Sequence, residues 1–141
     1  MSRIIKFRAK IAGTDKWIFG LPNAVYSENE IDSIQDIKNK QIEYIKTDTL
    51  GQFTGFKDKN GVEIYDGDVV KWDDGSNGKH WRVAIIELFP ELKFRCIHSF
   101  NGLESSCKDY VFTYGSFIYR DTENHFFVIG NKYDDVELLK E

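Results

Sequence analysis

The sequence is poor in proline, methionine and cysteine. Its 141 residues include two prolines and one methionine, which excludes a proline-rich linker and a methionine-rich binding groove. Cys96 and Cys107 are the only cysteines, so they provide neither a disulfide framework nor a four-ligand zinc site unless histidine joins them. We expect two buried free thiols, because the sequence shows no export signal, and a cross-strand disulfide is the minority alternative.

Long apolar runs are also missing. No run approaches the roughly 20 apolar residues that cross a membrane as a helix. The N-terminal segment carries Arg3, Lys6, Arg8 and Lys10 but not the apolar stretch of a signal peptide. We therefore expect a cytoplasmic protein that has no membrane partner.

The sequence has few histidines, and none stands in a catalytic pattern. His80, His98 and His125 have no Cys, Ser or acidic neighbour at a recognised catalytic or metal-ligand spacing. His98 follows Cys96 by two residues, which would place both on one face of a strand. We interpret this pair as a coincidence of strand spacing, because a Cys-His nucleophile requires a specific three-dimensional site. The prediction is a protein that is not an enzyme and has no catalytic residue.

Four aspartates near the middle of the chain are the one hint of a metal site. Asp66, Asp68, Asp73 and Asp74 are clustered as carboxylate ligands of a hard cation are. The remaining ligand positions of a calcium loop are missing, and aspartate beside glycine is typical of turns. We predict no metal and no cofactor, and a metal-dependent hydrolase that uses Asp66 and Asp68 is the lowest-ranked alternative.

Aromatic residues, in contrast, are abundant. The chain contains 11 Phe, 7 Tyr and 3 Trp, residues that favour the pleated surface of a sheet. The net charge of −4 is modest, so it argues only weakly against a nucleic-acid binder and leaves room for a local basic patch. Length and composition together predict one small β-rich domain with an ample core.

The segment from Gln52 to Trp72 is the most informative part of the sequence. Asp58-Lys59-Asn60-Gly61 is typical of a hairpin turn, because the aspartate can bond the turn backbone and the glycine adopts a left-handed conformation. Residues on both sides alternate polar and apolar, as in half-buried strands. Asp66-Gly67-Asp68 marks a second turn before the apolar run that ends at Trp72. The segment predicts three strands in quick succession.

The N-terminal part predicts a hairpin followed by the only helical candidate. Residues 4–10 read as a strand with Ile5, Phe7 and Ala9 on one face, and residues 17–19 as its return, with a break at residues 21–23. Between Ser27 and Asn39 a capping-box spacing and isoleucines at every third position predict a short or irregular helix. A further strand is expected over residues 41–45.

The rest of the chain predicts short strands separated by turns. They are expected at residues 69–72, 81–89, 93–99, 110–113, 116–119 and 126–129, with a loop at 73–79 and a stop at Pro90. We predict one all-β domain over residues 1–141, with a soft boundary near residue 50. Residues 1–49 form an N-terminal hairpin with at most one short helix, and residues 50–141 form a partly open SH3-like barrel.

The N-terminal strand offers a candidate binding face. Lys6, Arg8 and Lys10 alternate on one face, close to Trp17, and cations beside an aromatic ring are the components of a single-stranded nucleic-acid platform. The alternative is an edge strand that Lys and Arg protect against pairing with another chain. Both interpretations place this face outside.

Three blocks of the sequence resemble the YopX family. They are Ile5-Lys6-Phe7-Arg8-Ala9, residues 49–61 together with Ile64-Tyr65-Asp66-Gly67-Asp68-Val69-Val70, and Phe127-Val128-Ile129-Gly130-Asn131-Lys132-Tyr133. The blocks occur in the family's order and bracket nearly the whole chain. Residues 20–48 and 90–120 match no pattern of the family, so nothing is carried over from them. YopX proteins are small proteins of phages, prophages and related mobile elements.

The resemblance implies a cytoplasmic all-β protein of two small subdomains in a bacterial host, and it carries no catalytic residue across. The shared motif residues instead suit tight turns and strands. They are Gly55, Asp58, Asn60, Gly61, Asp66, Gly67, Asp68, Gly130 and Asn131. The expected function is a noncatalytic phage or prophage accessory protein that binds a host or phage protein or assembles with itself. Nucleic-acid binding through the N-terminal basic strand is the alternative.

Overall fold

The structure is a computed structural model that describes residues 4–24, 30–73, 80–89, 91–106, 110–113 and 124–141. The chain divides into two compact units, Met1–Gly55 and Phe56–Glu141. Both are built from antiparallel strands, and in the described residues the only helical segments are short 3-10 turns. The prediction of an all-β protein is therefore confirmed.

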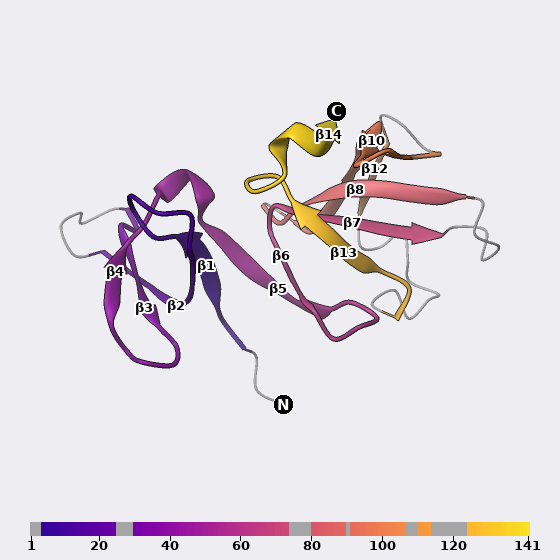
Figure 1. The fold of residues 1–141 in the computed structure, drawn as a ribbon. Coiled ribbons are helices and arrows are strands. Elements are labelled where there is room, and N and C mark those ends of the chain that lie inside the picture. Colours follow the sequence, from indigo (N-terminus) through magenta and orange to yellow (C-terminus); the bar gives the residue numbers. More distant parts are fainter. Residues whose placement is uncertain (1–3, 25–29, 74–79, 90, 107–109, 114–123) are drawn as a thin grey trace. The chain divides into compact units, whose positions relative to one another are not determined.

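The N-terminal unit is a meander of consecutive strands. Its elements are β1 (Phe7–Lys10), β2 (Trp17–Asn23), β3 (Ser33–Asp36), β4 (Ile42–Tyr44), the 3-10 turn η1 (Thr47–Thr49) and β5 (Gly51–Lys57). The strand order of the sheet is β4-β3-β2-β1-β5-β6, where β6 (Glu63–Tyr65) is the edge strand that follows β5. Each of β2 and β3 lies between its neighbours in sequence, and β5 returns to the free side of β1 (Figure 1).

This sheet curls until the end of β4 reaches the end of β1. Ile11 and Ile45 form an isolated bridge, Lys46 donates its backbone N–H to Lys10, and Ala12 donates to Tyr44. The concave side encloses a small core. The buried core residues are Ala9, Ile18, Ile34 and Ile45. Because strand residues alternate between faces, the intervening side chains of β1 and β2 point to the outer face.

Two expectations for this unit are wrong. No helix forms in the described part of residues 27–39, since β3 pairs with β2 on one side and with β4 on the other. Asn, Asp and Ser are poor residues for a helix interior, and two ladders of backbone hydrogen bonds outweigh the weak helical signal. The break expected at residues 21–23 is also absent. Pro22 is tolerated within β2 because the pairing with β1 ends at Gly20, so no β1 carbonyl requires an N–H there.

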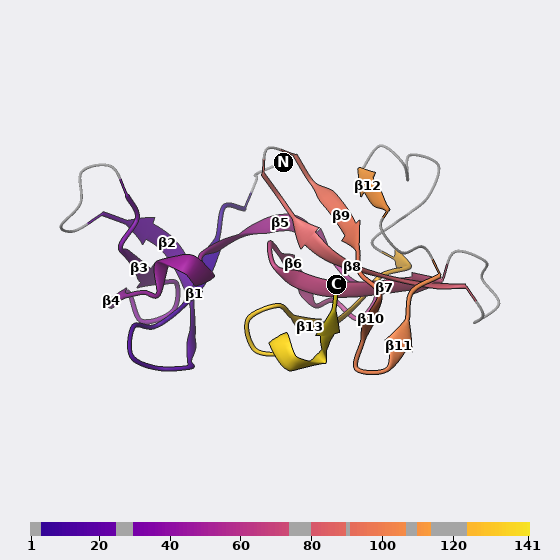
Figure 2. The same ribbon diagram turned by 90° about the horizontal axis from the view of Figure 1, so that it is seen from above.

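The C-terminal unit contains the remaining strands. They are β6 (Glu63–Tyr65), β7 (Asp68–Asp73), β8 (Trp81–Glu87), β9 (Lys93–Cys96), β10 (Ser99–Phe100), β11 (Leu103–Glu104), β12 (Val111–Thr113), β13 (Phe127–Asn131), the 3-10 turn η4 (Val136–Leu138) and β14 (Leu139–Lys140). β6 is the edge strand next to β5 in the six-stranded sheet, and the other strands form a five-stranded sheet of order β12-β9-β8-β7-β13 and a small sheet of order β11-β10-β14. Figures 1 and 2 both show β7, β8 and β13 side by side.

β7 and β8, two neighbouring inner strands of the five-stranded sheet, are buried on both faces. One face carries Val70, Ala84 and Ile86 into a core that also contains Trp72, Phe94 and Phe126. The other carries Val69, Val83 and Ile85 into a second core closed by Phe100, Leu138 and Leu139. Trp72 contacts the rings of Phe94, Phe112 and Phe126 at centroid distances of 5.9, 5.9 and 5.2 Å. Aromatic side chains thus form a substantial part of this core.

The strands predicted in this unit are found, with shifted ends, wherever the structure describes them. The strand expected over residues 93–99 is divided into β9 and β10, because the chain moves from the large sheet to the small one at Ile97 and His98. The strand at 116–119, most of the loop at 73–79, and Pro90 lie outside the described residues. The SH3-like form of the barrel stays a prediction. In the residues described, no helix is long and apolar enough to cross a membrane.

Candidate functional site

The side chains in the segment from Gln52 to Trp72 hold the backbone of its two turns in place. Asp58 is buried at the β5–β6 turn, where its Oδ1 accepts hydrogen bonds from the backbone N–H groups of Asn60 and Val62 at 2.8 and 2.9 Å. Gly61 follows with a φ of +80°, a conformation that side chains rarely adopt. Oδ2 accepts a third bond from the N–H of Val128 in β13 at 2.9 Å. All these contacts are structural, so this carboxylate is committed to the fold.

The second turn of the motif is equally occupied. Asp68 is buried and its Oδ2 accepts the backbone N–H of Tyr65 at 2.7 Å. Gly67, with a φ of +92°, leaves space for the ring of Tyr133, since a Cβ there would lie 2.8 Å from Cε2. Asp66 lies in the turn between β6 and β7, half-buried. Asp58, Asp68 and the two glycines therefore have roles in turn geometry.

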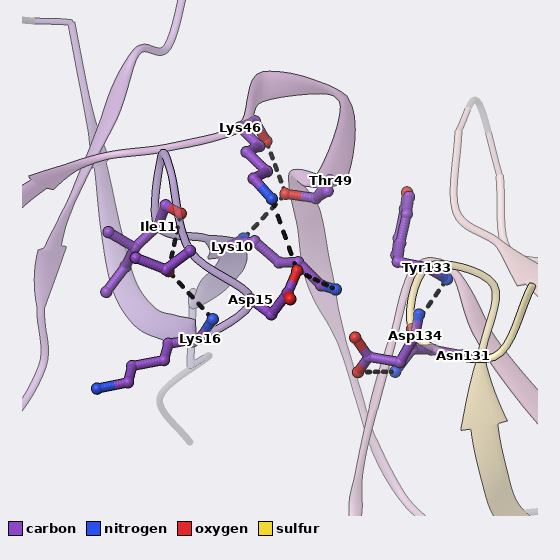
Figure 3. Close-up of polar contacts among 10 residues, drawn as sticks. Lys10, Ile11, Asp15, Lys16, Lys46, Thr49, Asn131, Tyr133 and Asp134 are labelled. Atoms are coloured by element: carbon purple, nitrogen blue, oxygen red, sulfur yellow. Dashed lines mark hydrogen bonds and ion pairs between the residues drawn. The ribbon is translucent and has the colours of Figure 1, made fainter.

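The motif residues near β5 and β13 serve the backbone in the same way. Gly55 has a φ of +92°. Gly130 follows a shift in the β13–β7 register, and a Cβ there would overlap Phe100 and Asp135. Asn131 Oδ1 accepts the N–H groups of Tyr133 and Asp134, and its side-chain amide donates to Asp134, as the right side of Figure 3 shows.

Candidate metal ligands and nucleophiles are not brought together in the part of the chain that is described. No group of three His, Cys, Asp or Glu side chains there could hold a metal ion. Cys96 is a buried thiol in the aromatic core, whereas Cys107 lies outside the described residues. His98 is not on the strand of Cys96, because β9 ends at Cys96. His80 and His125 are exposed.

The predicted basic face does assemble around an aromatic ring. The register pairs Lys10 with Trp17 and Arg8 with Phe19 across β1 and β2, and cross-strand partners share a face. The Arg8 guanidinium carbon lies 4.6 Å from the Trp17 ring centroid, and Lys10 Nζ lies 5.6 Å from it. Lys6 Nζ lies 5.5 Å from the ring centroid of Phe53 in β5. These are cation–π distances.

The expectation that this face is exposed is wrong for two of its cations. Arg8 and Lys10 each keep 7% of their surface exposed. Lys10 Nζ also lies 3.8 Å from Asp15, which Lys46 approaches from the other side at 3.7 Å (Figure 3). η1 covers the strand end, where Thr49 Oγ1 accepts the Lys10 N–H at 2.9 Å. The charges of Arg8 and Lys10 are therefore largely inaccessible to a phosphate group. Their contacts with Trp17, Asp15 and Thr49 stabilise the sheet.

The same outer face continues into an apolar patch that the sequence interpretation missed. Cross-strand pairs link Leu21 to Gln35 and Gln35 to Ile42, and Ile37 donates its N–H to Phe19. Five apolar side chains here are between 37% and 53% exposed, and we call them the outer patch. They are Phe19, Leu21, Ile37, Ile42 and Tyr44. The available signal was β2 itself, where apolar residues occupy both the inward and the outward positions.

These features define a small all-β protein of two units with an apolar, cation-bordered sheet face. The chain belongs to the YopX family, since the family model described as YopX protein matches residues 6–140. A solved structure, the crystal structure of protein EF1440 from Enterococcus faecalis, is similar over 99% of this chain and 100% of that one. Its sequence identity is 26% and its TM-score 0.57. No curated protein matches the chain. Neither the family description nor the name of that protein indicates a catalytic activity.

Proposed function

We propose that this chain is a noncatalytic binding module, an accessory protein of a phage or prophage, that docks a protein partner on the outer patch of its N-terminal unit. The observation that carries the proposal is the exposure of five apolar side chains on one sheet face. A half-buried sheet ordinarily places apolar residues on its core side and polar residues on its solvent side. In β2 the outward positions hold Phe19 and Leu21 instead.

The size of the outer patch supports an interface. From the exposed fractions and side-chain areas of about 150 to 250 Å², the patch presents roughly 400 to 500 Å² of apolar surface. This is the size of the largest apolar patch on a typical monomer, which is often functional, and about half of the roughly 800 Å² that each partner contributes to a standard interface. Interfaces of that class have an apolar centre and a polar rim. The patch is therefore suited to be the centre of such an interface.

The charges around the patch indicate the chemistry of the partner. Lys38 and Lys40 are exposed in the β3–β4 turn, beside Ile37 and Ile42 of the patch. Lys40 Nζ donates to the carbonyl of Ile37, so one of these cations is held next to the apolar surface. A complementary partner presents apolar side chains ringed by carboxylates. Asp36 in the same turn offsets one of the two charges, so the turn carries one net positive charge. Two identical faces would bring these like net charges together, which favours a different protein over a second copy.

The test is a comparison of captured proteins. Leu21→Glu/Ile42→Glu places two charges within the patch, and the matched control Phe89→Glu/Val136→Glu places two on exposed apolar positions of the other unit. We expect the immobilised wild-type protein and the control to capture the same partner from a lysate of the infected host, and the patch variant to lose it. Identical capture by all three forms contradicts the proposal. Light scattering of the pure proteins separately shows whether the patch binds a second copy.

A further inference from the structure

A second cation–aromatic cluster lies in the C-terminal unit, and it differs from the N-terminal one in exposure. Two ammonium groups converge on the ring of Phe127, with Lys59 Nζ at 5.8 Å and Lys71 Nζ at 5.7 Å from its centroid. Lys71 Nζ also lies 4.6 Å from the ring centroid of Trp81. The two rings meet edge to face at 6.3 Å. Lys59 is exposed and the other three side chains are half-buried.

The fold holds this cluster at one end of the five-stranded sheet. Lys71 is the cross-strand partner of Phe127, and Asp73, two residues further along β7, is the partner of Trp81. Lys71, Phe127, Asp73 and Trp81 therefore share one face of the sheet. Farther along β7 and β8 the same face carries the second core. Lys59 comes from the β5–β6 turn, where its N–H donates to the carbonyl of Phe126 at 2.9 Å. Both lysines are thus placed by backbone pairing.

The charge of the cluster is only partly compensated. Among the described residues neither Lys59 nor Lys71 lies within ion-pair distance of a carboxylate. Asp73 shares the face, so the four side chains and this aspartate leave one net positive charge on a protein whose net charge is −4. Two cations beside two aromatic rings are suited to bind a ligand that has both an anionic group and a flat ring.

We propose that this cluster binds single-stranded nucleic acid, with a base stacked against Trp81 or Phe127 and backbone phosphates beside Lys59 and Lys71. Aromatic side chains beside cations that follow the backbone are the features by which proteins bind single strands without reading sequence. The site lies in a different unit from the outer patch and does not depend on it. Because the two lysines contact phosphates, binding is salt-sensitive. Because the net charge of the protein is −4, nucleic acid binds at this local cluster and not over the surface at large.

The test measures the anisotropy of a labelled oligothymidylate at low and moderate salt. We expect Lys59→Glu/Lys71→Glu to weaken binding at least about tenfold at low salt and to flatten the slope of log affinity against log salt by about 1.4, which is two phosphate contacts. Removal of one stacking ring in Trp81→Ala weakens it by roughly tenfold. The matched control is Lys16→Glu/Lys140→Glu, two exposed lysines that belong neither to this cluster nor to the outer patch, which leaves binding unchanged.

Fluorescence supplies a second readout that a general effect of charge does not move. Binding is expected to quench tryptophan emission in the wild type and in Trp17→Phe, but not in Trp81→Phe, since Trp72 is buried in the core. Lys59→Gln/Lys71→Gln removes the charges without adding repulsion and serves if the glutamate variant does not fold. No binding by the wild type at low salt, or equal losses in the control and the cluster variants, overturns the proposal.

Discussion

The carboxylate of Asp58 accepts a hydrogen bond at 2.9 Å from the backbone N–H of Val128, 70 residues later in the chain. Its other oxygen caps the turn in which Asp58 itself lies. One buried side chain therefore fixes a local hairpin and the start of β13 together. The sequence pattern that indicates a turn contains no sign of the second contact.

Replacement of Asp58 is expected to lower the free energy of unfolding by more than replacement of an ordinary turn residue. Asp58→Ala leaves three backbone N–H groups without their acceptor in a buried site, and we expect the free energy of unfolding to fall by about 2 to 4 kcal/mol. Asp58→Asn keeps one acceptor oxygen but turns an amide towards one of the donors, so its loss is about half as large. Urea denaturation measures both. A loss below about 0.5 kcal/mol for Asp58→Ala, typical of a surface substitution, would contradict this role.

Two glycines with similar backbone conformations provide a matched pair. Gly61 and Gly67 have φ values of +80° and +92°, but a Cβ at Gly61 would meet open space and one at Gly67 would lie 2.8 Å from the Tyr133 ring. We expect Gly61→Ala to destabilise by about 1 kcal/mol, the cost of the conformation, and Gly67→Ala by at least about 1 kcal/mol more. The double variant Gly67→Ala/Tyr133→Ala tests the contact, because removal of the ring abolishes the steric part. Equal thermal shifts for the two single variants would show that Tyr133 does not matter.

Asp36 is expected to make the stability of the N-terminal unit depend on acid pH. Backbone hydrogen bonds from Lys38 and Asn39, with the nearby charges of Lys38 and Lys40, lower the pKa of Asp36 below its ordinary value. A lowered pKa in the folded state means that the contribution is complete above the ordinary carboxyl pKa of about 4 and is lost as the pH falls through the lower folded value.

The measurement is the stability difference between the wild type and Asp36→Asn as a function of pH. We expect a constant difference near neutral pH that shrinks below about pH 4. Since Asp36 lies partly exposed at the end of β3, the effect is small, and stability is best followed by a probe within the N-terminal unit. A difference that grows on acidification has the wrong sign for a lowered pKa and would refute the assignment.

Cys96 is expected to react only when the protein unfolds. Its thiol belongs to the core with Trp72 and Phe94 and is 5% exposed. In a Cys107→Ser variant, which leaves Cys96 as the only thiol, a thiol reagent should show no rapid reaction under native conditions and one equivalent in denaturant. Rapid modification of the native variant would place Cys96 near solvent.

The parts of the fold that the sequence reveals are those with local causes. The Asp58 and Gly67 turns and the strands around them could be predicted, because a turn depends on a few adjacent residues. The helix expected over residues 27–39 failed, because pairing of β3 with two neighbouring strands decided its conformation. The burial of Arg8 and the exposure of Leu21 were hidden for the same reason. Alternation identifies two faces but does not tell which of them a core will cover.

The docking of a partner on the outer patch is tested most directly by backbone hydrogen exchange of the full chain, alone and saturated with the captured partner. The account predicts slower exchange in β2, β3 and β4, around Leu21 and Ile42, with no change in the β9–β12 region of the other unit. Protection confined to residues 56–141, or none in β2 and β4, would contradict it.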